Sequence, residues 1–243
     1  MIIHKPLPKI EAISFDLDDT FYDNWPHIKA ADQYLLDYIS KHYPQAAHYT
    51  RQDWTLFKLK ALQEQPELAH HVSVLREVTL TKAFVFAEMN AEDIPSAVSK
   101  CFDAFYDKRS DFMVSKGIRR LLRSLSYRLP LVAITNGNVD CKKIGIGKYF
   151  SHILLAGPDG RMKPSADMFN KASILLNIPP EKMLHVGDNL DKDIKGAIDA
   201  GYNTAWYAAD RQMAISNERD ARLLPHIQLK HLKELKRIIK KQR

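Results

Sequence analysis

The sequence is poor in cysteine and has no long apolar run. Its 243 residues include two cysteines, Cys101 and Cys141, which are too few for a disulfide framework and lack the spacing of a metal site. No stretch approaches the roughly 18 consecutive apolar residues of a membrane span, and the first residues lack the apolar segment of a signal peptide. We therefore expect free thiols, no membrane partner and a cytoplasmic protein.

Glycine is absent from residues 27–107, and this region also carries no strand signal. Within it, apolar residues recur three and four positions apart over 31–39, 54–62, 72–88 and 91–106, which is the spacing of one face of a helix. This pattern predicts four or five helices. Because no strand lies among them, we expect a separate all-helical unit inserted after the first strand.

The excess of basic residues is concentrated in the C-terminal tail. The formal net charge is +7, and residues 230–243 hold seven Lys or Arg against one Glu. Apolar residues recur at helical spacing in the same region, namely Leu229, Leu232, Leu235, Ile238 and Ile239. The tail is therefore predicted to be an amphipathic helix that docks an apolar stripe, and no nucleic-acid partner is expected.

Three carboxylates and a hydroxyl follow a short apolar run near the N-terminus. Residues 13–15 fit a buried strand of a parallel sheet, and Asp16, Asp18, Asp19 and Thr20 come directly after it. Ligands bind at this end of strands in open α/β sheets, and carboxylates so close repel one another unless a cation or proton lies among them. One interpretation is a metal site in which one carboxylate attacks and another moves a proton. The other is a turn in which Asp caps backbone amides.

The pattern of an α/β protein resumes after the helical region. Strand-like apolar runs alternate with helical segments, the strands at 131–134, 150–156, 183–186 and 203–207 and the helices at 118–125, 165–177 and 191–200. This alternation predicts a doubly wound parallel sheet. Its strands end at Asp16, Thr135 and Asp188, whereas His185 lies inside a strand and is expected in the core.

Four motifs follow one another along the chain. They are D-x-D-x-T from Asp16, Thr135 at a strand end, Lys163 before a proline, and G-D-x-x-x-x-D from Gly187 to Asp193. Taken singly, these residues are better explained as a strand-ending turn at Thr135, a surface lysine at Lys163 and capping residues at Asp188 and Asp193. In this order, they resemble the haloacid dehalogenase superfamily of phosphotransferases.

The resemblance implies a fold and a domain organisation. The fold is α/β, with a Rossmann-like doubly wound parallel sheet core and an inserted all-helical cap domain. The core would comprise residues 1–22 and 110–243, and the cap residues 23–109. In this superfamily the cap largely sets the choice of substrate.

The resemblance also implies catalytic roles. Asp16 would be the nucleophile that accepts the phosphoryl group, and Asp18 would protonate the leaving alcohol and then deprotonate the attacking water. Thr135 and the amides after it, beginning with that of Asn136, would bind the phosphoryl oxygens of the substrate. Lys163 would neutralise their charge.

The implied cofactor is Mg²⁺, which prefers oxygen ligands. Asp16, Asp188 and the backbone carbonyl of Asp18 would hold the ion, and Asp193 would complete or brace its shell. Asp191 lies off the motif and is expected to be a charge at a helix N-terminus.

Four longer stretches resemble the YigB-type bacterial phosphatases more closely. They are 15–24, 130–138, 156–164 and 222–227. This group is associated with FMN and with 5-amino-6-(5-phospho-D-ribitylamino)uracil, an intermediate of riboflavin biosynthesis. The resemblance implies a Mg²⁺-dependent phosphatase whose partner is a small phosphorylated metabolite of this kind.

Other functions stay open at this stage. They are a broad sugar-phosphate phosphatase, a phosphomutase or a dehalogenase of the same superfamily, and a non-catalytic regulator that binds a ligand or partner through its cap. Asp18 argues against a dehalogenase, because carbon–halogen cleavage has no alcohol to protonate. The presence of all the expected catalytic residues argues against a regulator, and nothing in the sequence predicts the oligomeric state.

Overall fold

A computed structural model describes residues 1–207 and 224–241 of the chain. Residues 222 and 223, part of one of the stretches that resemble YigB-type phosphatases, and the last two residues of the basic tail lie outside the described residues. The chain divides into two compact units. The α/β unit comprises Met1–Asp23, Met113–Gly137 and the chain from Gly145 onward, and the helical unit comprises Asn24–Phe112 and Asn138–Ile144.

The α/β unit is built on one seven-stranded sheet. Its strands are β1 (Ile2–Ile3), β2 (Ala12–Phe15), β3 (Leu131–Thr135), β4 (His152–Leu155), β5 (Met183–Gly187), β6 (Asn203–Tyr207) and β7 (Ile227–Leu229). The order is β1-β7-β6-β5-β2-β3-β4, and every neighbouring pair is parallel except β1 with β7. The described residues of β2, β3 and β5 are all buried, as their continuous apolar runs require. The predicted doubly wound parallel sheet is confirmed.

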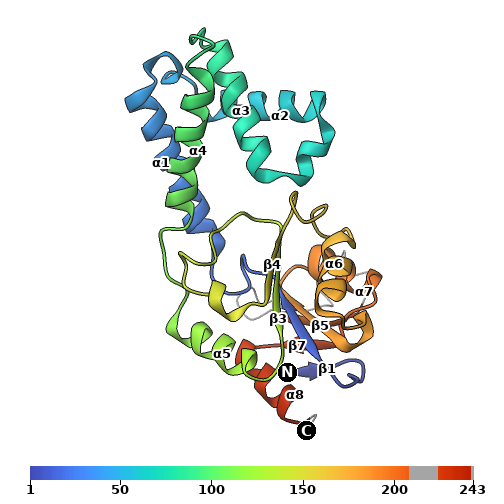
Figure 1. Cartoon of the computed structure of the whole chain (residues 1–243). Coiled ribbons are helices and arrows are strands. Elements are labelled where there is room, and N and C mark those ends of the chain that lie inside the picture. The colour runs from blue at the N-terminus through green and yellow to red at the C-terminus, as the bar shows by residue number, and fades with distance from the viewer. Residues whose placement is uncertain (208–223, 242–243) are drawn as a thin grey trace. The chain divides into compact units, whose positions relative to one another are not determined.

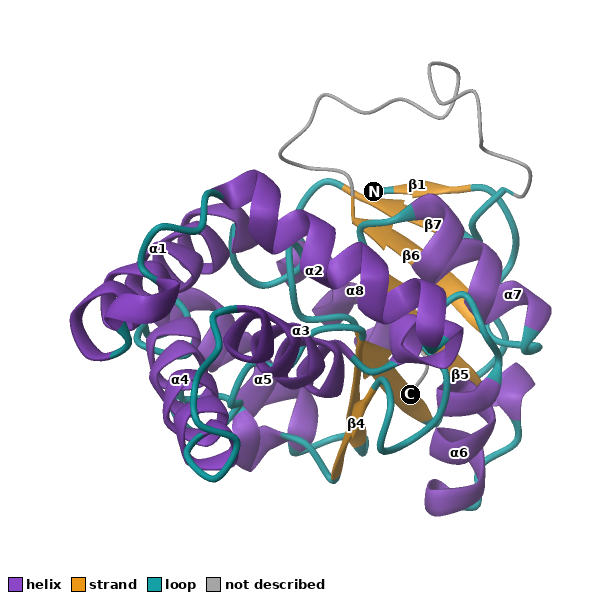
Figure 2. Cartoon of the chain, turned by 90° about the horizontal axis from the view of Figure 1, so that it is seen from above, coloured by secondary structure: helices purple, strands orange, loops and turns teal. Residues whose placement is uncertain are grey.

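Helices cover both faces of this sheet. They are α5 (Lys116–Ser126), α6 (Asp167–Leu176), α7 (Gly196–Asp199) and α8 (Leu235–Lys241). Figure 1 shows α5 and α8 on one side of the strands and α6 and α7 on the other, and Figure 2 shows strands β1, β7, β6 and β5 in succession across the sheet. Helices that connect parallel strands cover the faces of the sheet in this way. One face is packed with buried side chains that include Val132, Ile134, Met168 and Phe169.

The sheet and its helices differ from the prediction in three places. Strands β1 and β7 were not expected, and Leu229, assigned to the terminal helix, belongs to β7. The helix predicted over 191–200 is a π-helix, Leu190–Lys195, that leads into the short α7. Asn189 caps this π-helix, since its side chain accepts hydrogen bonds from the amides of Asp191 and Lys192. The predicted N-terminal position of Asp191 is therefore correct, whereas the predicted single helix is wrong.

The helical unit contains four α-helices, in agreement with the apolar spacing of its sequence. They are α1 (Asn24–His42), α2 (Arg51–Glu64), α3 (Val72–Phe86) and α4 (Ile94–Arg109), and α1 packs on α4, α2 on α3 and α3 on α4. Thr50 begins α2 with a capping box that it shares with Asp53. Leu35, Leu80 and Phe84 are among the buried side chains that join these helices. No helix of the described chain is long and apolar enough to span a bilayer.

Candidate active site

The carboxyl ends of three neighbouring strands bring the predicted residues together. Asp16 follows β2, Thr135 ends β3 and Asp188 follows β5. Strand β2 lies between the other two, and Phe15 pairs in register with Ala133 on one side and with a β5 residue on the other. Parallel strands in register end at the same edge of the sheet. The three side chains therefore start from one small region, as the sequence predicted.

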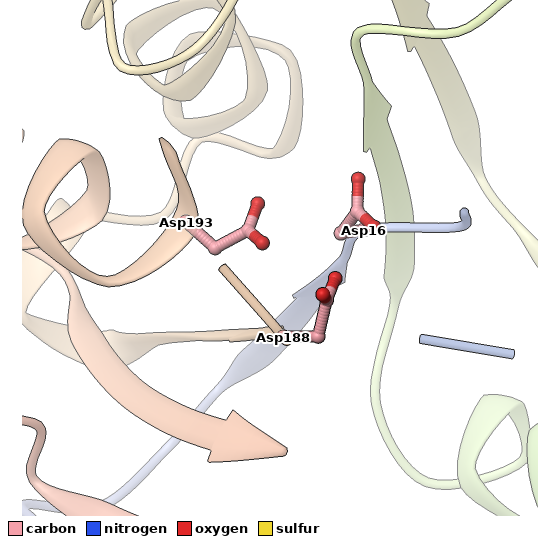
Figure 3. Close-up of side chains that lie close together, drawn as sticks. All are labelled: Asp16, Asp188 and Asp193. Carbon is pink, nitrogen blue, oxygen red and sulfur yellow. The ribbon is translucent and has the colours of Figure 1, made fainter. Parts of the chain in front are cut away.

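Three buried carboxylates gather at this edge and form what we call the carboxylate cluster. Its members are Asp16, Asp188 and Asp193, each offering an oxygen within 4.8 Å of the others. Figure 3 shows the three side chains pointing toward one another from β2, from the end of β5 and from the π-helix. All three are at least nine-tenths buried. Burial of like charges at this distance requires compensating positive charge.

Lys163 supplies part of that compensation. Its Nζ atom donates to Asp16 Oδ1 at 2.7 Å and to Asp193 Oδ1 at 2.6 Å, and the side chain is almost wholly buried. Burial alone would lower the pKa of this lysine, but Asp16 and Asp193 outweigh that effect and raise its pKa above the usual range. Lys163 is therefore a permanent cation at this site.

Asp193 is held from several directions. Its Oδ1 atom accepts the hydrogen bond from Lys163 and lies 3.4 Å from His185 Nε2. Its Oδ2 atom accepts from the backbone amide of Asn189 at 2.9 Å. Burial would raise the pKa of this carboxyl, but Lys163 and His185 together hold its pKa well below the usual range. His185 lies in the core as predicted, and it also fixes Asp193, which the sequence did not indicate.

Gly187 makes room for this arrangement at the end of β5. A Cβ atom at this position would lie 2.3 Å from the Cγ of Asp193, far inside van der Waals contact. Glycine is needed here for the close approach of the carboxylate to the strand. The Gly-Asp pair of the fourth motif thus has a steric reason for its first residue and a chemical reason for its second.

Thr20 links two members of the carboxylate cluster. Its hydroxyl lies within hydrogen-bond distance of Asp16 Oδ2, at 3.2 Å, and of Asp188 Oδ1, at 3.4 Å. The backbone carbonyl of Asp188 accepts from the indole of Trp206 at 2.7 Å. Sequence reasoning assigned no role to Thr20, although its place in the D-x-D-x-T motif was a signal.

Asp18 is a neighbour of the carboxylate cluster but not a member of it, and its side chain is partly exposed. Its Oδ1 atom accepts from the hydroxyl of Tyr22 at 2.6 Å. Asp19 has a left-handed backbone with φ of 60°, which turns the chain sharply between these residues. The sequence did not indicate Tyr22, although its position four residues after Asp18 in the same turn is a usable signal.

The turn after β3 comprises residues Thr135–Gly137, and we call it the β3 turn. Thr135 Oγ1 accepts from the amide of Gly137 at 3.0 Å, so its O–H group is the part that can donate to a ligand. The side chain of Asn136 accepts from the backbone N–H of Lys163 at 2.7 Å and donates to its carbonyl at 2.9 Å. Asn136 therefore holds the segment that carries the buried ammonium.

The electrostatics of the carboxylate cluster favour a bound divalent cation. Burial raises the pKa of Asp16 well above its usual value, and the neighbouring carboxylates Asp193, Asp188 and Asp18 raise it further, against the opposing effect of Lys163. Three carboxylates beside one ammonium leave an excess of two negative charges when all are ionised. Their oxygen atoms suit a hard cation such as Mg²⁺, so the residues present fit the ion that the sequence implied.

Residues 10–201 match the haloacid dehalogenase-like hydrolase family, and the chain belongs to that family. It is 34% identical over 239 residues to the 5-amino-6-(5-phospho-D-ribitylamino)uracil phosphatase YigB of Escherichia coli strain K12, a comparison that covers 98% of this chain and 100% of that protein. It is 25% identical over 205 residues to the glyceraldehyde 3-phosphate phosphatase of Pyrococcus abyssi, covering 82% of this chain and 81% of that one.

A solved structure agrees with this placement. The crystal structure of a 2-haloacid dehalogenase from Pseudomonas syringae pv. Tomato DC3000 matches with a TM-score of 0.89 and 28% identity, over 96% of this chain and 99% of the other. The superfamily predicted from the motifs, the similarity to YigB and the enzyme class, a phosphatase, are confirmed by these findings.

Proposed function

We propose that this phosphatase hydrolyses small phosphomonoesters through a phosphorylated Asp16. The observation that carries the proposal is the different surroundings of two carboxylates at one strand end. Asp16 lies in the buried cluster beside Lys163, at 2.7 Å, whereas Asp18 lies outside the cluster with Tyr22. One carboxylate is placed to attack and the other to transfer protons.

The reaction assigned to these residues has two steps. In the first, an oxygen of Asp16 forms a bond to phosphorus, the bond from phosphorus to the leaving oxygen breaks, and Asp18 gives that oxygen its proton. In the second, Asp18 takes a proton from water, whose oxygen attacks phosphorus and releases inorganic phosphate from Asp16. Thr135, the amides of the β3 turn and Lys163 would stabilise the charge on the phosphoryl oxygens.

Bound Mg²⁺ would neutralise the carboxylate cluster and the phosphoryl group and so favour the ionised form of Asp16. Asp16, Asp188 and the backbone carbonyl of Asp18 would hold it. Asp193 has oxygens engaged by Lys163 and by the Asn189 amide, which supports its role as a brace of the site over that of a direct ligand.

The substrate we propose is FMN or 5-amino-6-(5-phospho-D-ribitylamino)uracil. Support comes from YigB, which is similar over nearly the whole chain and whose name gives the second compound. A sugar or triose phosphate is the second candidate, because a relative named glyceraldehyde 3-phosphate phosphatase also matches. A dehalogenase is less well supported, since an acid such as Asp18 has no leaving alcohol to protonate in that reaction. A cytoplasmic location stays a prediction.

The test is an assay of the purified protein on a panel of phosphate esters with Mg²⁺, including both flavin-related compounds, triose phosphate and 2-haloacids. We expect phosphate release that EDTA abolishes and Mg²⁺ restores, with the flavin-related esters preferred. Ca²⁺ should substitute poorly, because its longer bonds and higher coordination number would engage both oxygens of Asp16. Full turnover without metal, or halide release in place of phosphate release, would overturn the proposal.

A further inference from the structure

The β3 turn touches the residue that we assign to proton transfer. A Cβ atom on Gly137 would lie 2.5 Å from Asp18 Oδ2 and 3.5 Å from Thr135 Oγ1. The carboxylate of Asp18 therefore rests directly against the backbone of Gly137. Any displacement of this backbone changes the space available to Asp18 and the hydrogen bond from Gly137 to Thr135.

The chain leaves the α/β unit immediately after Gly137. Residues Asn138–Ile144, which we call the strap, belong to the helical unit, and the chain returns to the α/β unit at Gly145. On sequence grounds this segment was placed in the core domain, 110–243. The difference has a physical cause, because two hydrogen bonds and an ion pair hold the strap to residues of the helical unit that are distant in the sequence.

Three polar contacts tie the strap to the helical unit. Asn138 Nδ2 donates to Ser73 Oγ in the first turn of α3 at 3.0 Å. The backbone N–H of Asp140 donates to the hydroxyl of Ser110, which follows α4, also at 3.0 Å. An ion pair joins Lys143 to Asp107 near the end of the same helix.

Buried residues accompany the two hydrogen bonds, whereas the ion pair of Lys143 with Asp107 is exposed. The strap residues Val139, Cys141 and Ile144 are buried, and Ser110 is only 2% exposed. Breaking the hydrogen bond to Ser110 is costly, because the hydroxyl of this buried residue would be left without a partner. The strap is thus fixed to α3 and α4, and its first residue is bonded covalently to Gly137.

From this arrangement we propose that Asn138, Ser73 and Ser110 are positioning residues for the proton transfer by Asp18. The strap, which these residues hold, constrains the backbone of Gly137 through the covalent bond that joins them, and Gly137 limits the space of the Asp18 carboxylate. This inference rests on the proposed function, in which Asp18 protonates the leaving oxygen. It gives the helical unit a part in the chemical step that is separate from its expected part in choosing the substrate.

The consequence is measurable through the leaving group. A nitrophenyl phosphate departs as a stable anion and needs little protonation, whereas an alkyl phosphate needs a well-placed acid. Since general acid catalysis is worth about 10²–10⁴-fold, partial misplacement in Ser73→Ala, Ser110→Ala and Asn138→Ala should cost about 5- to 50-fold in kcat on an alkyl phosphate. On nitrophenyl phosphate the first step should be slowed less than about twofold.

Single-turnover rates of phosphate-ester cleavage on both substrates provide the test, because they isolate the first step. Ser73→Thr keeps the hydroxyl and should restore the alkyl phosphate rate. Thr55→Ala removes an exposed hydroxyl that donates to the carbonyl of Arg51 within α2, and should leave both rates unchanged. Equal losses on the two substrates in the strap variants would overturn the inference, as would the absence of any loss.

Asp18→Asn separates failure of the inference from failure of the proposed function. If this variant shows the strong dependence on the leaving group while the strap variants do not, only the positioning role is wrong. If Asp18→Asn itself shows no such dependence, Asp18 is not the acid and the proposed function fails with it. Melting temperatures near that of the unmodified protein establish that each variant is folded. Ser73 lies at a half-buried position, so Ser73→Ala is the variant whose folding should be least affected.

Discussion

Asn136 and Lys163 bind each other as two peptide groups do in a sheet. The side-chain amide of Asn136 accepts from the backbone N–H of Lys163 at 2.7 Å and donates to its carbonyl at 2.9 Å. This pair joins the β3 turn to the segment whose side chain ends between Asp16 and Asp193. Asn136, which was expected to bind phosphate through its backbone amide, thus also fixes the position of the Lys163 backbone through its side chain.

The first prediction concerns this pair. Asn136→Ala removes both hydrogen bonds and leaves polar groups of Lys163 without their partner. We expect the free energy of unfolding to fall by about 1–3 kcal/mol. Activity should fall by about 10–100-fold, as for other residues that orient a catalytic group. Urea unfolding and kcat/KM check both effects. Asn136→Asp keeps the acceptor for the N–H of Lys163, so its stability and activity should lie between those of Asn136→Ala and the unmodified protein. Full activity in Asn136→Ala would contradict this role.

The second prediction separates the two carboxylates of the first motif. Asp16→Asn removes the nucleophile and should lower activity at least about 10³-fold. Its melting temperature should barely fall and can rise, because a charge leaves a crowded acidic cluster. Asp18→Asn keeps the nucleophile, so with a good leaving group phosphorylated Asp16 should accumulate, and mass spectrometry of acid-quenched enzyme would detect it. More than a tenth of the normal rate in Asp16→Asn would show that another group attacks.

The third prediction tests the steric role of Gly187. Gly187→Ala places a methyl group where the carboxylate of Asp193 now lies, so Asp193 must move and Lys163 loses a partner. Overpacking of this kind costs about 1–3 kcal/mol, and activity should fall with it. Gly117→Ala is the matched control, because the nearest atom to its added Cβ is Ser115 Oγ at 3.8 Å. The control should keep full activity and gain up to about 1 kcal/mol of stability. Equal behaviour of the two variants would refute the steric argument.

The fourth prediction follows from the buried thiol of the helical unit. Burial raises the pKa of Cys101 to about 12, whereas an unfolded cysteine ionises near about 8.5. The unfolded chain therefore loses this proton first. The stabilisation is complete below about pH 8.5 and is lost as the pH rises toward 12. Between pH 7.5 and pH 10, the free energy of unfolding in urea should fall more in the unmodified protein than in Cys101→Ala. Identical losses would show that the thiol titrates alike in both states.

The sequence predicted those parts of the fold that local patterns specify. Buried parallel strands and amphipathic helices each have a characteristic apolar spacing, which is why β2, β3, β5 and the four helices of the insert were expected. Strands β1 and β7 are too short, at two and three residues, to show any alternation. The strap could not be assigned because its partners, Ser73 in α3 and Ser110 after α4, are distant from it in the sequence.

The candidate site was predictable to a similar degree. The ends of parallel strands meet at one edge of a sheet, so the convergence of Asp16 and Asp188 followed from the motifs. Lys163 was expected at the site only through the resemblance, and its ion pairs with Asp16 and Asp193 were not expected, because only the folded chain fixes the direction of its side chain. The hydrogen bonds of Asn136 with Lys163 and the contact of His185 with Asp193 were not predictable for the same reason. A local sequence pattern does not indicate which residue of another element will contact a given side chain.

The last prediction concerns exchange of the helical unit and rests on the proposed function. Residues 24–112 alone, or together with residues 138–144, would be replaced by the matching segments of a sugar-phosphate phosphatase. The metal requirement and the dependence on Asp16 should persist in both chimeras, because those groups belong to the α/β unit.

The two chimeras should differ in the chemical step. The first chimera combines a foreign helical unit with the native residues 138–144, so the contacts of the strap are not matched. It should be slow on alkyl phosphates and less affected on nitrophenyl phosphate. With the strap included, the second should recover the alkyl phosphate rate and prefer sugar phosphates. If a folded second chimera still prefers FMN or the ribitylaminouracil phosphate, selectivity must lie in the α/β unit. The loop at residues 157–163, which leads into Lys163, would then be the segment to exchange next.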